Sequence, residues 1–260
     1  MPTKPRHPAL FVGHGSPMNA IEENAFSSCW RQLGKELPVP RAILCVSAHW
    51  ETSGTKVTSV AQPRTIHDFY AFPPVLYEQR YPAPGSPELA AQVVALLGAD
   101  NVALDAEWGL DHGTWAVLCH LYPQANIPVI QLSLDRGKSA AGHYALAQRL
   151  APLREDGVLI IGSGNLVHNL GRLRWDADAT PYPWATEFDR RAAELISAGD
   201  HAALIDYPSL GEAARLAIPT NEHYLPLLYT LAQQQPGEAA TFFAAEIVLA
   251  SISMRGVRIG

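Results

Sequence analysis

Histidine is the residue type with the most evident capacity for chemistry in this sequence. Ten histidines occur among 260 residues. A neutral imidazole is the commonest metal ligand in proteins, and an imidazole near its ordinary pKa accepts and donates protons. Six of the ten stand beside glycines, acidic residues or the ends of apolar segments, and we treat them as the candidate functional residues. They are His14, His49, His67, His112, His168 and His223.

The other four histidines lie in contexts that favour a structural or exposed role. His120 lies in an apolar, helix-like stretch, so we expect it to be structural. His7, His143 and His201 have polar or helical neighbours, and we expect them at the surface. A lone histidine is more often a hydrogen-bonded structural residue than a ligand, so a metal site needs a second indication.

Placement relative to apolar segments supplies such an indication for His14, His49 and His168. The segments before them lack polar residues and read PALFV (8–12), AILCV (42–46) and VLII (158–161). Continuous apolar runs are typical of strands buried on both faces of a sheet. Ligands of open α/β sheets collect at the carboxyl ends of the strands. His14 and His49 can therefore share a small volume, which favours a metal site, but their spacing is less diagnostic than a helical HExxH motif.

The elements that must position these histidines are predicted as strands alternating with helices. Residues 127–134 and 241–253 are further predicted strands. Helices are predicted over 86–97, 114–121, 139–150, 184–198 and 200–205. This alternation predicts an α/β fold, a single-domain sandwich over residues 1–260, with a central, mainly parallel or mixed sheet and helices on both faces. The Pro-rich stretch 62–87 is predicted to be an irregular loop that could cover a site.

Composition excludes several classes of protein. The formal charge is −6 and no basic residues cluster, so we expect no nucleic-acid partner. No window approaches eighteen apolar residues, and the first residues lack the apolar stretch of a signal peptide, so we expect no membrane span and a cytoplasmic location. Three cysteines without a CxxC pair argue against disulfides and against thiolate metal ligands: Cys29, Cys45 and Cys119.

Other catalytic motifs are absent from the glycine-rich segments. Residues 13–17 (GHGSP) match neither a GxSxG nucleophile elbow nor a P-loop. Residues 162–164 (GSG) lack the GxGxxG spacing of a dinucleotide site. A Ser-His-Asp hydrolase that uses Ser16 or Ser163 stays open but has no signature.

Longer segments carry a more specific pattern, in order, over nearly the whole chain. Those that contain the six histidines read FVGHGSPMNAIEENAF (11–26), VSAHWET (46–52), TIHDFYAFP (65–73), WGLDHGTWAVL (108–118), GSGNLVHNL (162–170) and NEHYLPLLYTLA (221–232). Together they resemble the class III extradiol ring-cleavage dioxygenases, in particular the 4,5-DOPA extradiol dioxygenase branch.

This resemblance implies an α/β enzyme with one non-haem Fe²⁺ per chain that opens the ring of a catechol, such as a DOPA-like substrate, with O₂. By the same resemblance, His14, His49 and His223 match the metal ligands. His168 matches an active-site acid/base that can also reach the metal. His112 matches a second active-site histidine near the substrate and dioxygen.

One departure concerns the third ligand, because other branches of the superfamily use a carboxylate there. Glu222 and His223 are adjacent, and neighbouring side chains point in different directions, so only one of them can ligate. The DOPA branch favours His223. An all-histidine site is also expected to accept Zn²⁺, so purified protein could carry zinc without zinc being the working metal.

His67 lies on the predicted loop and has two interpretations. It could contact a carboxylate of the substrate, or its imidazole could tie the loop to Asp68. Two other functions compete with ring cleavage: a zinc hydrolase or amidase on the same histidines, and a non-catalytic signalling relative, which would be expected to have lost some of these histidines. The expected partners are a small catechol and O₂, and the sequence is compatible with a homo-oligomer.

Overall fold

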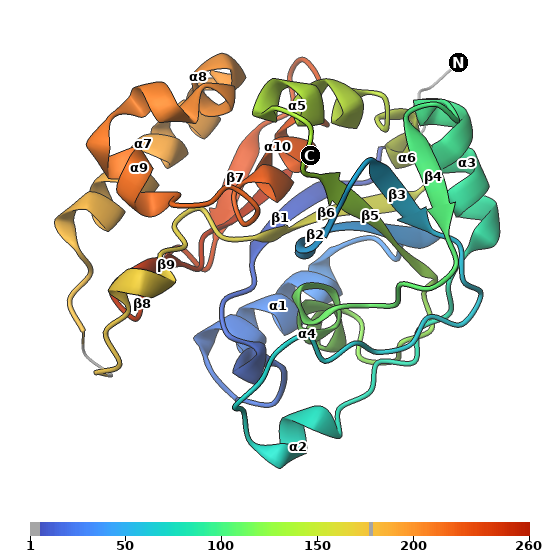
Figure 1. Ribbon diagram of the computed structural model, residues 1–260, viewed down its shortest axis with the longest axis horizontal. Coiled ribbons are helices and arrows are strands. Elements are labelled where there is room, and N and C mark those ends of the chain that lie inside the picture. The colour runs from blue at the N-terminus through green and yellow to red at the C-terminus, as the bar shows by residue number, and fades with distance from the viewer. Residues whose placement is uncertain (1–5, 177–178) are drawn as a thin grey trace.

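A mixed eight-stranded sheet runs through the middle of the structure, a computed structural model that describes residues 6–176 and 179–260 (Figure 1). The strand order is β4-β3-β5-β2-β6-β1-β10-β7. The four central strands, β5, β2, β6 and β1, are parallel, whereas β3 pairs with β5, and β10 with both β1 and β7, in antiparallel fashion. The strands are β1 (Ala9–Gly13), β2 (Ala42–Thr52), β3 (Thr55–Thr58), β4 (Val102–Asp105), β5 (Val129–Asp135), β6 (Val158–Gly164), β7 (Ala240–Phe243) and β10 (Gly256–Ile259), and β8 (Ile247–Val248) with β9 (Ile252–Ser253) forms a separate pair.

Helices cover both faces of the sheet because both faces of its central strands are apolar. Along β1, Leu10 and Val12 pack into one hydrophobic cluster, whereas Ala9 and Phe11 pack into the other. The face below the sheet in Figure 1 carries α1 (Ala25–Glu36), α2 (Pro74–Tyr77) and α4 (His112–Leu121). The opposite face carries α3 (Pro87–Leu97), α5 (Ala140–Gln148), α6 (Pro152–Glu155), α7 (Pro183–Ala198), α8 (His201–Ile205), α9 (Glu212–Ala217) and α10 (Leu225–Leu231). The predicted α/β fold is confirmed, and none of the described helices is long and apolar enough to cross a membrane.

Side-chain caps explain where three helices begin. Ser86 caps α3 by accepting a hydrogen bond from the Leu89 amide, and Ser139 caps α5 in the same way. The start of α4 differs from the prediction, because this helix begins at His112 rather than at residue 114. Asp111 is its N-cap and accepts from the Thr114 amide, which places His112 in the first turn.

The predicted strand over 241–253 is wrong. The segment forms the three short strands β7, β8 and β9, separated by turns. Ala244, Leu249 and Ala250 have φ angles of 50°, 49° and 64°, in the left-handed region that interrupts a strand. The turns bring β8 and β9 away from the edge of the main sheet, where they form their own antiparallel pair.

Two histidines expected at the surface, His7 and His143, are buried, which corrects the prediction for both. His143 lies inside α5, and its Nδ1 is 2.9 Å from the Tyr229 hydroxyl. Burial lowers the pKa of His143 to about 4. Its helical context concealed this, because α5 packs against α10, a helix that the sequence analysis did not predict.

The depressed pKa predicts a specific acid sensitivity. The unfolded chain takes up a proton on His143 near pH 6.5, but the folded chain resists it until about pH 4. Stability is therefore retained above pH 6.5 and lost as the pH falls from 6.5 towards 4, by up to about 3 kcal/mol for this residue. Urea unfolding of wild type and His143→Gln, with a chelator present, should show a shallower pH dependence for the variant. Parallel pH profiles would contradict the prediction.

Candidate metal centre and substrate cavity

Five of the six candidate histidines converge at the carboxyl edge of the sheet. The ring centroids of His14 and His49 are 5.0 Å apart, those of His14 and His223 are 5.3 Å apart, and those of His49 and His223 are 5.1 Å apart. His112 lies 3.9 Å from His49, and His168 stacks on His223 at 3.5 Å. Histidines separated by up to 209 positions in the sequence thus form one cluster.

Each histidine of the cluster comes from a different element. His14 follows β1, and His112 opens α4. His49 lies within β2 rather than after it as predicted, because β2 continues to Thr52 through a register shift against β5. His168 follows β6, and His223 lies in the turn before α10.

Glycines allow the backbone segments of the site to approach one another closely. A Cβ on Gly164, at the end of β6, would lie 2.1 Å from the carbonyl oxygen of His223. That oxygen accepts a hydrogen bond from the Asn165 amide at 2.8 Å, so the turn that carries His223 rests directly on the end of the strand. A Cβ on Gly113 would meet the Ser47 hydroxyl at 2.6 Å and the ring of His49 at 3.0 Å. The cluster can therefore pack in this way only because positions 164 and 113 are glycines.

The hydrogen bonds of Ser163 determine the tautomer of His14. The Ser163 hydroxyl donates to the Gly113 carbonyl oxygen at 2.5 Å, which uses its single proton. Its contact with Nδ1 of His14, at 2.9 Å, must therefore be one in which the imidazole donates. A neutral His14 then carries its proton on Nδ1 and presents a bare Nε2 to the centre of the cluster.

Asp68 has the same effect on two histidines at once. Its Oδ1 accepts from the backbone amide of His112 at 2.8 Å, and its Oδ2 lies 2.9 Å from Nδ1 of His112 and 3.3 Å from Nδ1 of His49. Burial alone would raise the pKa of Asp68, but the hydrogen bonds and charge of His112 outweigh it and lower that pKa. The ionised carboxylate can only accept, so His112 holds a proton on Nδ1. The same oxygen, 3.3 Å from Nδ1 of His49, favours a proton on that nitrogen as well.

Glu222 stands behind His223 rather than beside it. Its Oε1 lies 3.0 Å from Nδ1 of His223 and accepts a hydrogen bond from the Thr220 hydroxyl. His223 lines the central cavity and Glu222 does not. This arrangement leaves Nε2 of His223 as the atom that faces the cluster.

The donor atoms fit a metal ion. Nε2 of His14 and Nε2 of His49 are 3.1 Å apart, within hydrogen-bonding distance. A bound cation would replace that hydrogen bond and be ligated by both nitrogens. Two nitrogens at that separation, each about 2.1 Å from an ion, subtend close to a right angle. Burial, followed by the neighbouring imidazoles, lowers the pKa of His49 to about 3 and the pKa values of His14 and His223 well below 6.5, so all three imidazoles are neutral at pH 7.

Proximity alone leaves two groupings of ligand atoms. One contains His14, His49 and His112, and the other contains His168, Glu222 and His223, with the ligand atoms of each group within 4.8 Å of one another. The predicted set of His14, His49 and His223 takes two members from the first group and one from the second. The choice among these sets belongs to the functional proposal below.

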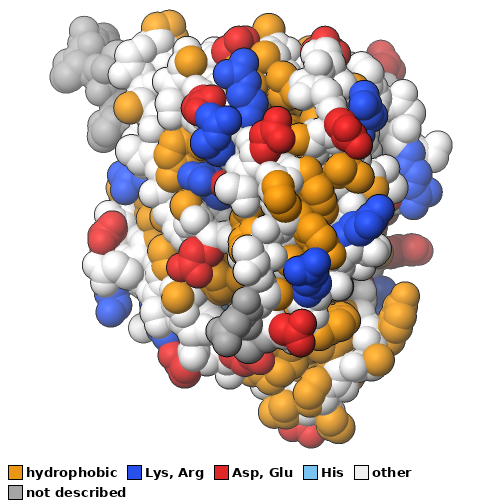
Figure 2. Space-filling model, turned by 90° about the vertical axis from the view of Figure 1, so that its left-hand side faces the viewer, with side chains coloured by type: hydrophobic (Ala, Val, Ile, Leu, Met, Phe, Trp, Pro, Cys, Tyr) orange, Lys and Arg blue, Asp and Glu red, His pale blue; other side chains and the backbone are white. Residues whose placement is uncertain are grey.

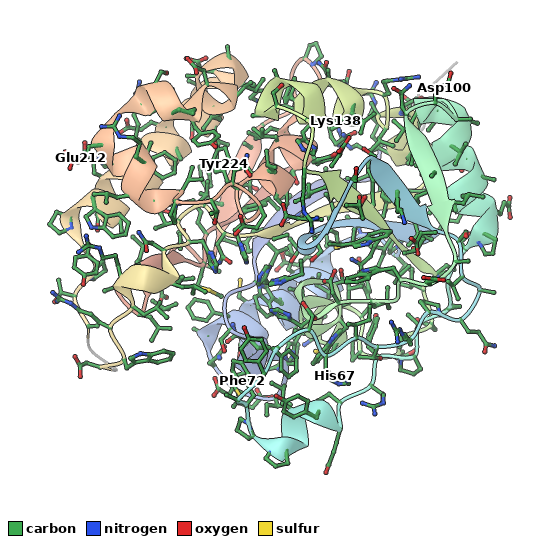
Figure 3. The ribbon with its side chains drawn as sticks, in the orientation of Figure 1. His67, Phe72, Asp100, Lys138, Glu212 and Tyr224 are labelled. Atoms are coloured by element: carbon green, nitrogen blue, oxygen red, sulfur yellow. The ribbon has the colours of Figure 1, made fainter. Side chains whose placement is uncertain are left out.

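His168 and His67 differ in their access to the site. The ring of His168 lines the cavity and makes no hydrogen bond to any described residue, and burial lowers its pKa to about 4. His67 does not line the cavity. It lies below the sheet in the view of Figure 3, between α4 and α2. Its Nε2 lies 3.1 Å from the Gln79 carbonyl oxygen, and its ring packs edge-on against Phe69. A substrate contact by His67 stays a prediction, and Asp68 contacts His49 and His112 instead.

Sequence reasoning missed Ser163 and Asp68 as groups that orient the ligands. Ser163 was considered only as a nucleophile, and Asp68 only as a partner for His67. The available signal was their position, since each stands in a histidine-containing segment and next to a strand end or within the long loop. Their hydrogen-bonding partners are distant in sequence, so the roles themselves were not visible.

A cavity of about 540 Å³ opens onto the histidine cluster and is otherwise largely apolar. Neutral histidines at the carboxyl edge of an α/β sheet, with an apolar cavity above them, form a site that is able to bind a metal ion beside an aromatic or apolar molecule. Comparison with known proteins gives the family. Residues 6–239 match the family described as the catalytic LigB subunit of aromatic ring-opening dioxygenases, and the chain belongs to this family.

Individual relatives agree with the family. The chain is 49% identical over 259 residues to the 4,5-DOPA dioxygenase extradiol of Escherichia coli (strain K12), covering 98% of this chain and 95% of the relative. It is 41% identical over 227 residues to the protein of the same name from Beta vulgaris, with 84% and 83% covered. A crystal structure of an uncharacterized protein from Escherichia coli K12 superposes with a TM-score of 0.86 at 44% identity, covering 98% of this chain and all of that one. The chain is therefore an extradiol dioxygenase by family.

The role of Ser163 predicts a loss of metal affinity in Ser163→Ala. Without the acceptor, Nδ1–H of His14 is unpartnered and the ring is free to rotate or change tautomer. Loss of such an orienting partner typically weakens metal binding about 10- to 100-fold. Zn²⁺ affinity should be measured by competition with a chelator, with Ser86→Ala, which removes a distant helix cap, as the matched control. Equal affinities in wild type and Ser163→Ala would refute the tautomer assignment.

Proposed function

We propose that this chain, as one catalytic unit over residues 1–260, is a non-haem Fe²⁺-dependent extradiol dioxygenase that opens the ring of a catechol with O₂. The observation that carries the proposal is the near-equilateral triangle of His14, His49 and His223 at the floor of an apolar cavity. The family and the relatives named 4,5-DOPA dioxygenase extradiol support a DOPA-like catechol as substrate.

The proposed ligands are His14, His49 and His223, with one iron per chain. Their three centroid separations are nearly equal, as expected for three ligands on one face of an ion. His112 is placed asymmetrically, 3.9 Å from His49 and 5.5 Å from His14. It also shares the Asp68 oxygen that holds His49, which suits a neighbour of the ligand set.

Bound Fe²⁺ would supply the redox-active centre that combines a catecholate with dioxygen, so that both oxygen atoms enter the ring-opened product. The protein's own part is to bind, orient and move protons. His168, neutral and without a hydrogen-bond partner among the described residues, would accept the proton of a catechol hydroxyl and return a proton as the ring opens. His112, held on Nδ1 by Asp68, would present Nε2 on the opposite side of the site as a second hydrogen-bonding group.

The proposal predicts activity with iron and not with zinc. Apoprotein should be reconstituted anaerobically with Fe²⁺ or Zn²⁺ and assayed with an oxygen electrode over a panel of catechols that includes DOPA. Oxygen uptake is expected only with Fe²⁺, because Zn²⁺ has no redox chemistry to offer dioxygen. Hydrolytic turnover of an ester or amide by the zinc form, without oxygen uptake by the iron form, would assign the site to a hydrolase instead.

Four single variants separate the proposed ligands from the proposed proton-transfer groups. His14→Ala and His223→Ala should lose metal, because each removes one of three ligands. His168→Ala and His112→Ala should retain metal while turnover falls by about 10²- to 10⁴-fold, the usual size of an acid–base contribution. Metal content by elemental analysis and oxygen uptake are both measured. Metal loss in His112→Ala with retention in His223→Ala would move the third ligand to His112, and metal loss in His168→Ala would make that residue a ligand.

A further inference from the structure

The walls of the cavity above the histidines are apolar on two sides. One side comes from η1 (Pro17–Ala20), α1 and the long loop, and includes Met18, Phe26 and Phe72. The other comes from η2 (Leu170–Arg172) and the β8–β9 turn, and includes Leu173, Leu249 and Ile252. Hydrophobic side chains also gather over the lower part of the face in Figure 2, where the long loop and α2 lie. The substituent of a bound ring would therefore meet mostly carbon.

The polar groups of the wall are largely occupied by the protein itself. Asn19 donates to the His14 carbonyl oxygen and accepts from Asn24. Asn24 accepts from the first amides of α1, and the Ser16 hydroxyl accepts from the Met18 amide. These side chains shape the wall and leave little capacity to recognise a charged substituent.

Glu22 is the exception, because it lines the cavity and its carboxylate has no ion-pair partner among the described residues. Its neighbour Glu23 points elsewhere and pairs with Arg31. Glu22 is exposed, so it stands at the rim, away from the buried histidines. It supplies the only negative charge among the described lining residues.

No lysine or arginine lines this cavity within residues 6–176 and 179–260. Two of the arginines that flank the wall in sequence are held by other groups, since Arg174 stacks over the Tyr182 ring and Arg255 pairs with Asp189. Arg172 is exposed and does not line the cavity. The three proposed metal ligands are neutral, so a divalent ion would contribute two positive charges, which a doubly deprotonated catechol already balances. Among the described lining residues, no positive charge then remains to bind a carboxylate on the substituent.

We propose, building on the proposed function, that the cavity selects catechols whose substituent is apolar and ends in a cationic or uncharged group, and that Glu22 is the specificity-determining residue for a cationic end. A carboxylate at the same position would meet Glu22 with like charge and an apolar wall with no compensating donor. In a zwitterionic substituent such as that of DOPA, the ammonium group would pair with Glu22, and the carboxylate of the substrate would remain exposed to solvent.

Three catechols with matched side chains test this selectivity: dopamine, dihydrocaffeate and 4-ethylcatechol. Each carries a two-carbon chain on the ring, which ends in an ammonium group, in a carboxylate or in no charged group, respectively. Dissociation constants are measured by calorimetry on the zinc-loaded, redox-inert protein, and kcat/KM by oxygen uptake on the iron-loaded protein. Dopamine should bind roughly tenfold more tightly than dihydrocaffeate, with 4-ethylcatechol between them, as expected for a partly exposed charge.

Variants at two adjacent glutamates assign the effect. Glu22→Gln should reduce the preference for dopamine over dihydrocaffeate, and Glu22→Lys should reverse it. Glu23→Gln makes the same charge change one position away, outside the cavity, and should keep the wild-type preference.

Two results would overturn the proposal. One is a preference of the wild type for dihydrocaffeate over dopamine. If that preference disappears in Arg172→Gln, the selectivity belongs to this exposed arginine instead of Glu22. The other is an undiminished dopamine preference in Glu22→Lys. If the predicted order of dissociation constants holds but the iron form consumes none of the catechols, the proposed ring-cleaving function fails while the selectivity of the cavity stands.

Discussion

The site depends on one electrostatic constraint: several imidazoles share one largely buried volume, so none of the central ones can be charged. Burial and mutual repulsion depress the pKa values of His14, His49 and His223, which makes them neutral before any ion arrives. Neutrality is not sufficient, because a neutral imidazole has one bare nitrogen, and it must face inward. Ser163, Asp68 and Glu222 accept hydrogen bonds from the Nδ1–H groups of His14, His112 and His223 from outside the cluster, which leaves the bare nitrogens of these imidazoles to face inward.

The topology of the sheet brings the histidines of the site and the groups that orient them to one edge. The parallel strands β1, β2 and β6 end side by side and deliver His14, His49 and Ser163 to one edge. His223 arrives from a turn between two helices and requires Gly164 for its approach. The antiparallel partners β10 and β7 extend the sheet beyond β1 and carry no candidate residue of the centre.

Apolar periodicity was enough to predict the α/β class, the buried central strands and five of the helices. The helix predicted over 86–97 also has its expected N-cap, Ser86. Local patterns failed where distant contacts decide the outcome. The segment 241–253 has strand-forming residues, but its backbone turns through three left-handed positions; His143 looks polar in sequence, yet α10 buries it. In the site, the histidine positions were visible from strand ends and family likeness, whereas the role of Asp68 depends on a loop folding back 44 residues from His112.

Glu222 lies behind His223, so its negative charge is close to the neutral histidines of the proposed ligand set without belonging to that set. A carboxylate bound directly to the ion would lower the net charge of the centre, whereas here Glu222 and Asp68 each stand one imidazole away. Through Nδ1–H they raise the basicity of the ligand nitrogens without occupying a coordination position. The full charge of a bound divalent ion would then remain for an anionic substrate to neutralise, which would favour deprotonation of a catechol. In the proposed centre the same balance would leave no positive charge for an acidic substituent. A histidine rather than a carboxylate as the proposed third ligand would thus act in the same direction as the lack of basic residues in the described cavity wall.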